Sequence, residues 1–260
     1  MTSQIGVQLY TLREHCRNPA DFAHTCQKLK RIGFVAVQVS AVGVDDPVQV
    51  KQILDDHGLS CVATHRNLDQ LRDTERVLEE HQILQCGLTA LSGFGSADTS
   101  EGQWREFIKD FRTLGQALGQ RGLRVGYHNH SHELAPFGED PARFNPRHTP
   151  LQLLLEQLQL PLWFEIDTYW IAHGGGDPAA WIDHCAGRLP ALHVKDMTVN
   201  AGRQQKMCEV GLGNLNWPRI LEACRHGGVE WYLIERDDGD LDPFESLRIS
   251  LENLRCWGLE

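Results

Sequence analysis

A regular alternation between two kinds of segment most constrains what this chain folds into. Apolar runs of strand length alternate with amphipathic segments of helical length, and the alternation completes eight cycles along the 260 residues. The predicted strands are rich in Val, Ile, Leu or aromatic residues and run over Ile5–Tyr10, Phe34–Ser40, Leu59–His65, Leu88–Gly93, Leu123–Asn129, Leu162–Tyr169, Ala191–Lys195 and Trp231–Glu235. This order predicts an α/β protein with a parallel sheet.

Capping residues support the predicted helix ends. The clearest helices are predicted over Pro19–Ile32, Pro47–His57, Asp69–Leu84, Gly102–Gln120 and Pro243–Trp257. Asn18 and Asp46 each supply a capping side chain before a first-turn proline, whose missing N–H costs nothing at that position. Glycines suited to a left-handed helix stop follow at positions 33, 58, 122 and 258.

The polar residues favour a closed barrel over an open sheet. Charged or imidazole side chains stand at the C-terminal ends of strands five to eight, and in a barrel these ends converge on one mouth. No GxGxxG motif follows the first strand, and Gly174–Gly176 lacks the lysine and the strand–turn–helix setting of a phosphate loop. We therefore expect a single (β/α)8 TIM barrel spanning residues 1–260 as one domain.

Charge and cysteine content exclude several classes of function. The net charge of −10 is unlike the basic footprint of a protein that binds nucleic-acid phosphates. The eight cysteines form no CxxC pair, which is typical of reduced thiols in a cytosolic enzyme, and no apolar stretch reaches the length of a membrane span. We expect a cytoplasmic protein that binds neither nucleic acid nor membrane. Trp170 and Trp257 leave a homo-oligomer open.

Predicted strand six ends in the most informative residues of the chain. Two-residue alternation places Glu165 and Asp167 on the same inward face of an apolar strand. Burying two carboxylates is costly unless a cation or several donors compensate them, and a metal ion supplies that charge. The alternative is that Asp167 only caps the following loop.

The next two strands also end in metal-ligating side chains, His193 and Glu235. With Asp167 they make a mixed nitrogen and oxygen set suited to Mn²⁺, Co²⁺, Zn²⁺ or Mg²⁺. Lys195 lies on the His193 face, one step nearer the mouth, where an ammonium holds a substrate oxygen or stabilises an enolate. Its alternative role is that of a solvated surface lysine.

Strand five is followed by the densest cluster of acid–base groups in the chain, Tyr127–Glu133. His128 and His130 share one face and are candidates for metal binding or proton transfer. Glu133, just beyond the strand, is the candidate fourth metal ligand.

The segments YHNHSHE, EIDTYW, LHVKD and IERD, in this order, together with an opening GVQLYTLR, resemble the sugar phosphate isomerase/epimerase family of xylose isomerase-like barrels. The resemblance covers nearly the whole chain. It implies one divalent metal ion held by side chains of strands five to eight, here Asp167, His193 and Glu235. Many relatives end strand five with a glutamate where this chain has His128, so Glu133 is assigned as the fourth ligand and His128 is its competitor.

The resemblance also implies a carbohydrate or polyol substrate. Isomerisation or epimerisation through an enediolate is the expected reaction, with proton transfer or electrostatic roles for His128, His130, Lys195 and Glu235. Substrate binding is assigned to Gln8, His65 and Glu209, the last in a glycine-rich loop that alternatively serves only as a lid.

Three other functions compete with this expectation. The alternative closest to it is a lyase or dehydratase acting on a keto-sugar or keto-inositol. An endonuclease IV-like activity needs more metal ligands and a DNA-binding surface, which an acidic chain lacks. A non-catalytic sugar-binding barrel is the remaining alternative.

Overall fold

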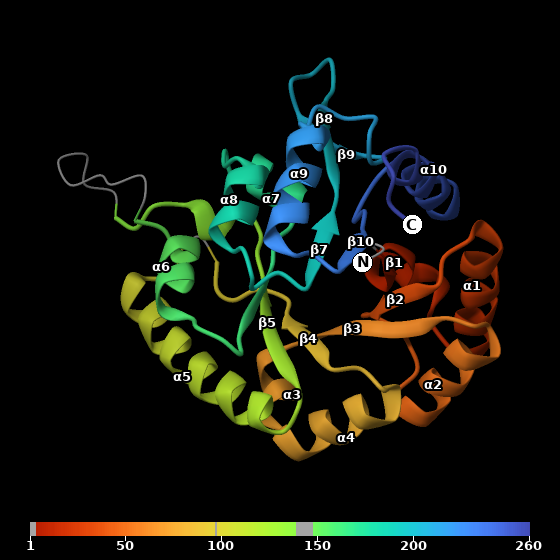
Figure 1. The fold of residues 1–260 in the computed structure, drawn as a ribbon, viewed down its shortest axis with the longest axis horizontal. Helices are drawn as coiled ribbons and strands as arrows, with labels where there is room; N and C mark the ends of the chain where they lie inside the picture. The colour runs from red at the N-terminus through yellow and green to blue at the C-terminus, as the bar shows by residue number, and fades with distance from the viewer. Residues whose placement is uncertain (1–3, 97, 139–147) are drawn as a thin grey trace.

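Eight parallel strands form a nearly closed barrel in the computed structural model, which describes residues 4–96, 98–138 and 148–260 (Figure 1). The strands are β1 (Gln4–Gln8), β2 (Ala36–Val39), β3 (Ser60–Arg66), β4 (Leu88–Leu91), β5 (Arg124–His128), β6 (Trp163–Glu165), β7 (Ala191–Val194) and β10 (Trp231–Ile234). Hydrogen bonding joins them in the order β6-β5-β4-β3-β2-β1-β10-β7. A parallel bridge between Asp167 and His193 brings the two ends of this order together. The predicted barrel is confirmed.

Helices surround the strands, and Figure 1 shows α1, α2, α4 and α5 along the outside of the sheet. The helices are α1 (Pro19–Ile32), α2 (Pro47–Asp56), α3 (Leu68–Arg72), α4 (Thr74–Leu84), α5 (Glu101–Gln120), α6 (Pro150–Gln157), α7 (Thr168–His173), α8 (Pro178–His184), α9 (Trp217–Gly227) and α10 (Pro243–Cys256), with 3-10 turns η1 (Leu9–His15) and η2 (His132–Leu134). Asn18 and Asp46 accept hydrogen bonds from first-turn amides as predicted. No helix of the described ranges is long and apolar enough to cross a membrane.

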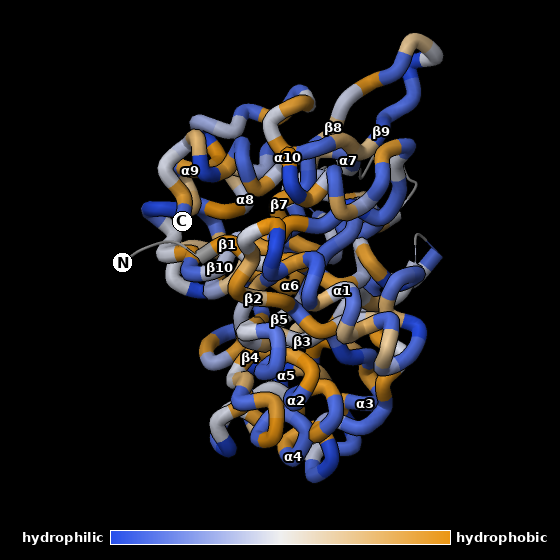
Figure 2. Tube along the Cα trace, turned by 90° about the vertical axis from the view of Figure 1, so that its right-hand side faces the viewer, coloured by the Kyte–Doolittle hydropathy of each residue, from blue (hydrophilic) through white to orange (hydrophobic). Residues whose placement is uncertain are grey.

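The side chains that fill the bottom of the barrel point to the same face of their strands as the acids of the predicted site. Trp163 and Leu233 belong to a small buried cluster, and each precedes a site acid, Glu165 or Glu235, by two residues on its strand. Gly126 makes room for this packing, because a Cβ there would lie 2.4 Å from the Trp163 ring. Figure 2 shows apolar residues concentrated on the strands and polar ones on the outer turns.

Several predicted boundaries are wrong. Predicted strand six was extended to Tyr169, but the strand ends at Glu165 and α7 begins at Thr168. Asp167 explains the early end, because its side chain accepts a hydrogen bond from the Trp170 amide and caps the helix. Tyr10 belongs to η1 for a similar reason, since the Gln8 side chain accepts from its amide.

An antiparallel hairpin that the alternation did not predict follows β7. Its strands are β8 (Asp196–Val199) and β9 (Gln205–Cys208), and the hairpin extends beyond the barrel in both views (Figures 1 and 2). Asp196 anchors the glycine-rich loop behind it: its carboxylate accepts from the amides of Gly211 at 2.9 Å and Gly213 at 3.0 Å, and from Trp217 Nε1 at 2.6 Å. The acid of the LHVKD segment therefore has a structural task.

A buried histidine joins α4 to the barrel wall. His81 Nδ1 donates to the Val77 carbonyl at 2.6 Å, and Nε2 lies 2.7 Å from Thr64 Oγ1 on β3. Burial lowers the pKa of His81 to about 4. The ring is therefore neutral at neutral pH.

Candidate metal centre

Side chains from the strand ends meet around a cavity of about 460 Å³ at the C-terminal mouth of the barrel. Its polar lining includes His65, His128, His130, Lys195, Glu235 and Asp237. These residues come from β3, β5, β7 and β10 and the segments just after them. Because the strands are parallel, their C-terminal ends lie on one side of the barrel, as the sequence predicted.

Four of the buried side chains are close enough to hold one cation: His128, Asp167, His193 and Glu235, called the metal group below. His193 Nδ1 lies 2.9 Å from Glu235 Oε2 and 3.8 Å from Asp167 Oδ2. The set combines two carboxylates with two imidazoles, a donor set that suits Zn²⁺, Mn²⁺ or Co²⁺.

Two orphaned atoms in this group show that the donor set fits a cation. Asp167 Oδ1 caps α7, whereas Oδ2 is buried without a hydrogen-bond partner among the described residues and faces the Lys195 ammonium at 3.1 Å. Nδ1 of His128 is likewise buried and lacks a hydrogen bond there, with Glu165 Oε2 3.5 Å away. Buried polar atoms that lack hydrogen bonds are costly, and a metal ion would supply the missing partner of both. Asp167 is thus both a helix cap and a candidate ligand.

An ammonium group lies among the acids of the site. Lys195, only 1% exposed, places Nζ 2.8 Å from Glu235 Oε2, 3.1 Å from Asp167 Oδ2 and 3.1 Å from Asp237. Burial alone would lower the pKa of Lys195, but the Asp167 and Glu235 carboxylates outweigh it and raise the pKa. The alternative of a solvated surface lysine is therefore excluded by burial.

The charges also shift the other members of the group. Burial alone would raise the pKa of Glu235, but Lys195 and His193 outweigh it and hold that pKa below its ordinary value. For His193, the Glu165 and Glu235 carboxylates outweigh burial and raise the pKa. The buried carboxylates of the protein thus favour positively charged groups at this point of the barrel.

Glu165 lies at the centre of a second group, with His65, His128 and His193. Its Oε1 accepts from Gln38 Nε2 at 2.7 Å, and its Oε2 lies 2.5 Å from His65 Nε2 and 3.2 Å from His193 Nε2. Hydrogen bonds already satisfy this carboxylate. Its contacts indicate that Glu165 positions the neighbouring imidazoles. It has no orphaned oxygen comparable to Asp167 Oδ2.

Glu133, the predicted fourth ligand, belongs to neither group. Its Oε1 accepts from the Tyr127 hydroxyl and its Oε2 from the His130 amide, each at 2.8 Å. Burial raises the pKa of Glu133. The structure therefore gives this acid the geometry of a support for the segment after β5, whereas His128 joins the metal group.

His130 borders the mouth without belonging to either group. Burial lowers its pKa to about 4, and its Nδ1 has no hydrogen-bond partner among the residues described. The ring lies 5.4 Å from that of Trp170. The Nδ1 atom is buried and lies toward Gly93, while the residue as a whole lines the mouth, where a neutral imidazole is able to accept a proton.

The predicted substrate-binding residues lie in three different settings. His65 lines the mouth, whereas Gln8 is fully buried and donates to Gln38 Oε1 at 2.9 Å. Glu209 pairs with Arg236 at 2.5 Å and borders a neighbouring cavity of about 600 Å³ beside the β8–β9 hairpin. Only His65 of the three lines the cavity that holds Lys195 and Glu235.

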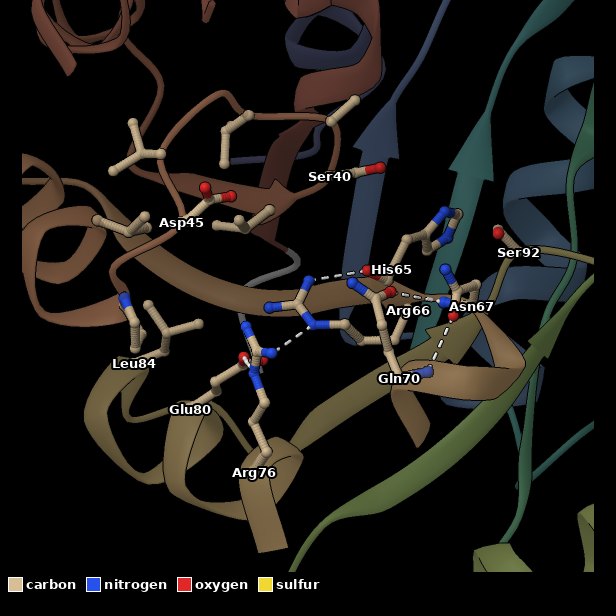
Figure 3. Close-up of a pocket in the computed structure, with 16 residues that line it drawn as sticks. Ser40, Asp45, His65, Arg66, Asn67, Gln70, Arg76, Glu80, Leu84 and Ser92 are labelled. Atoms are coloured by element: carbon tan, nitrogen blue, oxygen red, sulfur yellow. Dashed lines mark hydrogen bonds and ion pairs between the residues drawn. The ribbon is translucent and has the colours of Figure 1, made fainter. Parts of the chain in front are cut away.

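A crevice of about 370 Å³ adjoins the mouth and shares His65, Ser40 and Ser92 with it (Figure 3). Figure 3 shows Arg66 and Arg76 directed at Glu80, with nitrogen-to-oxygen distances of 3.3 and 3.0 Å. The Glu80 carboxylate already pairs with both guanidinium groups, and Asp45 also lines the crevice. We therefore assign no ligand to this crevice.

Sequence reasoning assigned no role to Gln38 or Asp237. Burial and the neighbouring Glu235 raise the pKa of Asp237 to about 6. A signal existed for both, since Gln38 is an amide inside the apolar run FVAVQVS and Asp237 is the last acid of IERD. Which neighbours they meet depends on strand order and register.

Comparison with known proteins agrees with the observed fold. The family model described as "Xylose isomerase-like TIM barrel" matches residues 26–257. No curated protein sequence matches the chain.

Solved structures share the fold at low sequence identity. A sugar phosphate isomerase/epimerase from Parabacteroides distasonis is 20% identical, with a TM-score of 0.78 over 99% of this chain and 95% of that one. The probable 3-DHS dehydratase AsbF from Bacillus anthracis is 13% identical, with a TM-score of 0.71 over 97% and 98%. A barrel protein from Mycobacterium smegmatis in complex with magnesium is 11% identical, with a TM-score of 0.72 over 97% and 95%.

Proposed function

Because the chain belongs to the xylose isomerase-like TIM barrel family, we propose that it is a metal-dependent isomerase or epimerase acting on a ketose or a related polyol. The observation that carries the proposal is the close grouping of four buried metal-ligating side chains, in which Asp167 Oδ2 and His128 Nδ1 make no hydrogen bond with the described residues. Similar folds that include an L-ribulose 3-epimerase support the class of reaction.

In this proposal Asp167, His193, Glu235 and His128 hold one divalent ion. When bound, the ion polarises a carbonyl and its neighbouring hydroxyl, which lowers the pKa of the carbon acid between them. The sequence assigned Glu133 as the fourth ligand and His128 as its competitor. We prefer His128, because both oxygens of Glu133 already accept hydrogen bonds.

The remaining mouth residues supply proton transfer and charge. His130 accepts the proton from carbon, because it is neutral and lines the cavity. Lys195 faces the same cavity, where its ammonium stabilises negative charge that develops on a substrate oxygen. His65, held by Glu165, binds a substrate hydroxyl.

Two measurements on the purified protein test the proposal. Elemental analysis and titration with Mn²⁺, Co²⁺, Zn²⁺ and Mg²⁺ should find one ion per chain, and Asp167→Ala should abolish it. A ¹H NMR assay in D₂O with a panel of ketoses should show exchange of the proton beside the carbonyl, with formation of the isomer or epimer. Absence of exchange with every metal would refute the reaction.

A dehydratase is the second candidate, and Asp237 favours it. Elimination needs an acid to protonate the departing hydroxyl, and a carboxyl group with a pKa of about 6 at the mouth is partly protonated near neutral pH. Loss of water from a keto-inositol in the same NMR assay would select this reaction, whereas exchange without loss of water selects the isomerase.

A further inference from the structure

Three polar side chains form a buried chain of hydrogen bonds inside the barrel, beneath the metal group. Gln8 on β1, Gln38 on β2 and Glu165 on β6 are all fully inaccessible to solvent. An apolar barrel interior would be cheaper to form, so three buried polar side chains need a structural or chemical reason.

The backbone amide at the start of this chain fixes the direction of every hydrogen bond in it. The Tyr10 backbone N–H can only donate, so the Gln8 atom 3.2 Å away is Oε1 and its Nε2 donates onward to Gln38 Oε1 at 2.9 Å. At the other end, Gln38 Nε2 donates to Glu165 Oε1 at 2.7 Å. Gln38 Oε1 therefore only accepts, because its own Nε2 is the donor to Glu165.

This direction makes His193 Nε2 a hydrogen-bond donor whether or not the other ring nitrogen carries a proton. Nε2 lies 2.7 Å from Gln38 Oε1, which accepts from Gln8 and cannot donate, and 3.2 Å from Glu165 Oε2. Nε2 is therefore an N–H donor. The opposite nitrogen, Nδ1, faces Glu235 at 2.9 Å and Asp167 at 3.8 Å, so without metal it donates to Glu235, and its proton is the one that a metal ion would displace.

We propose that Gln38 is a positioning residue that holds His193 with its proton on Nε2, so that Nδ1 is the nitrogen presented to the metal. Gln8 and Glu165 act through Gln38 by fixing the orientation of its amide. The inference rests on the proposed metal-dependent function, and it extends the site to β1 and β2, which contribute no ligand. A hydrogen bond to the other ring nitrogen of a ligand histidine commonly fixes its tautomer and its ring orientation.

The test uses Zn²⁺ as the probe with the full-length protein and two nearly isosteric variants, Gln38→Met and Gln8→Met. Loss of a partner that orients a ligand typically weakens metal binding by roughly 10- to 100-fold, which is the effect expected for Gln38→Met in calorimetric titration. Gln8→Met should weaken Zn²⁺ binding less, because Gln38 keeps its bond to Glu165. The control is Thr64→Val, a buried hydrogen-bonding residue on β3 outside the metal group. This variant should lose thermal stability without losing Zn²⁺ affinity.

A second readout reports the tautomer itself. Long-range ¹H–¹⁵N spectra of protein labelled with ¹⁵N-histidine should show an Nε2–H signal for His193, with and without Zn²⁺, assigned by its loss in His193→Gln. Gln38→Met should shift this signal or speed its exchange, and Thr64→Val should not.

Three results would overturn the inference: wild-type Zn²⁺ affinity in Gln38→Met, a His193 ring bound to Zn²⁺ through Nε2, or a second equivalent of Zn²⁺ bound at Glu165. A wild-type protein that binds no Zn²⁺, Mn²⁺, Co²⁺ or Mg²⁺ but shows the Nε2–H signal would instead refute the proposed function and leave the orienting role of Gln38 standing.

Discussion

Replacing Lys195 by methionine should destabilise the metal-free protein and strengthen its response to metal. The ammonium lies 2.8 Å from Glu235 and 3.1 Å from Asp167. At an effective dielectric constant of about 20, unit charges at these distances attract by about 5–6 kcal/mol per pair, before the cost of burying the ammonium. Removing one partner of a buried ion pair leaves the other unpaired, and the net loss is typically about 3–5 kcal/mol. For a chain of this size, that loss lowers the melting temperature by roughly 6–20 °C.

Metal should reverse this loss, because a divalent cation takes over the charge that Lys195 supplied. Thermal unfolding is measured for wild type and Lys195→Met, each with EDTA and with saturating Mn²⁺. The rise in melting temperature on adding Mn²⁺ should be larger in the variant, since no ammonium competes for Asp167 and Glu235. Lys206→Met removes an exposed lysine of β9 and serves as the control for lost charge. Equal stability of Lys195→Met and wild type in EDTA, or a larger Mn²⁺ effect in wild type, would contradict the assignment.

Further predictions concern metal affinity, loop packing and acid stability. In titrations with Mn²⁺, His128→Gln should weaken metal binding by more than the roughly 10- to 100-fold that is typical of losing an orienting partner. Glu133→Gln should keep the Mn²⁺ affinity within about tenfold of wild type. The reverse order of effects would make Glu133 the ligand. Gly213→Ala should cost at least about 1 kcal/mol of unfolding free energy in urea, because its Cβ would lie 2.3 Å from Asp196 Oδ1. His81 has a folded pKa of about 4 against an ordinary 6.5, so the unfolded state binds more protons as the pH falls between these values. Stability should therefore drop by about 2 kcal/mol from pH 7 to pH 5, and unfolding of His81→Gln should lack this component.

The eightfold alternation of strands and helices predicted the barrel, because residues within or next to each element determine where it begins and ends. The bounds of α1 were predicted to the residue from Asn18, Pro19 and Gly33, each of which acts within one helical turn. The β8–β9 hairpin was not predicted, since its strands are short and mostly polar or half-buried. The start of α7 was also missed, because TYW continues an apolar run and only the capping contact of Asp167 ends the strand.

The residues of the candidate site that lie at strand ends were predictable from the sequence. Asp167, His193 and Glu235 were singled out because each ends an apolar strand, and parallel strands bring such ends together. The part played by Glu133 depends on how the segment after β5 turns, which places its oxygens on Tyr127 and on the His130 amide. No periodicity in the sequence encodes that turn.

Glu165 and Asp167 show how register separates a structural acid from a ligand. Both are fully buried on β6 or just after it, and they are two residues apart on one face. Glu165 contacts the amide of Gln38 and the imidazoles of His65 and His193, so these groups stabilise its negative charge from several sides. Asp167 lies one step nearer the mouth, where a helix amide satisfies one oxygen and no hydrogen bond from the described residues satisfies the other. That second oxygen faces the Lys195 ammonium at 3.1 Å and makes no hydrogen bond with a described residue, so it remains able to coordinate a metal ion. This free coordinating oxygen, and not burial itself, is what makes Asp167 the residue on which metal binding should depend most.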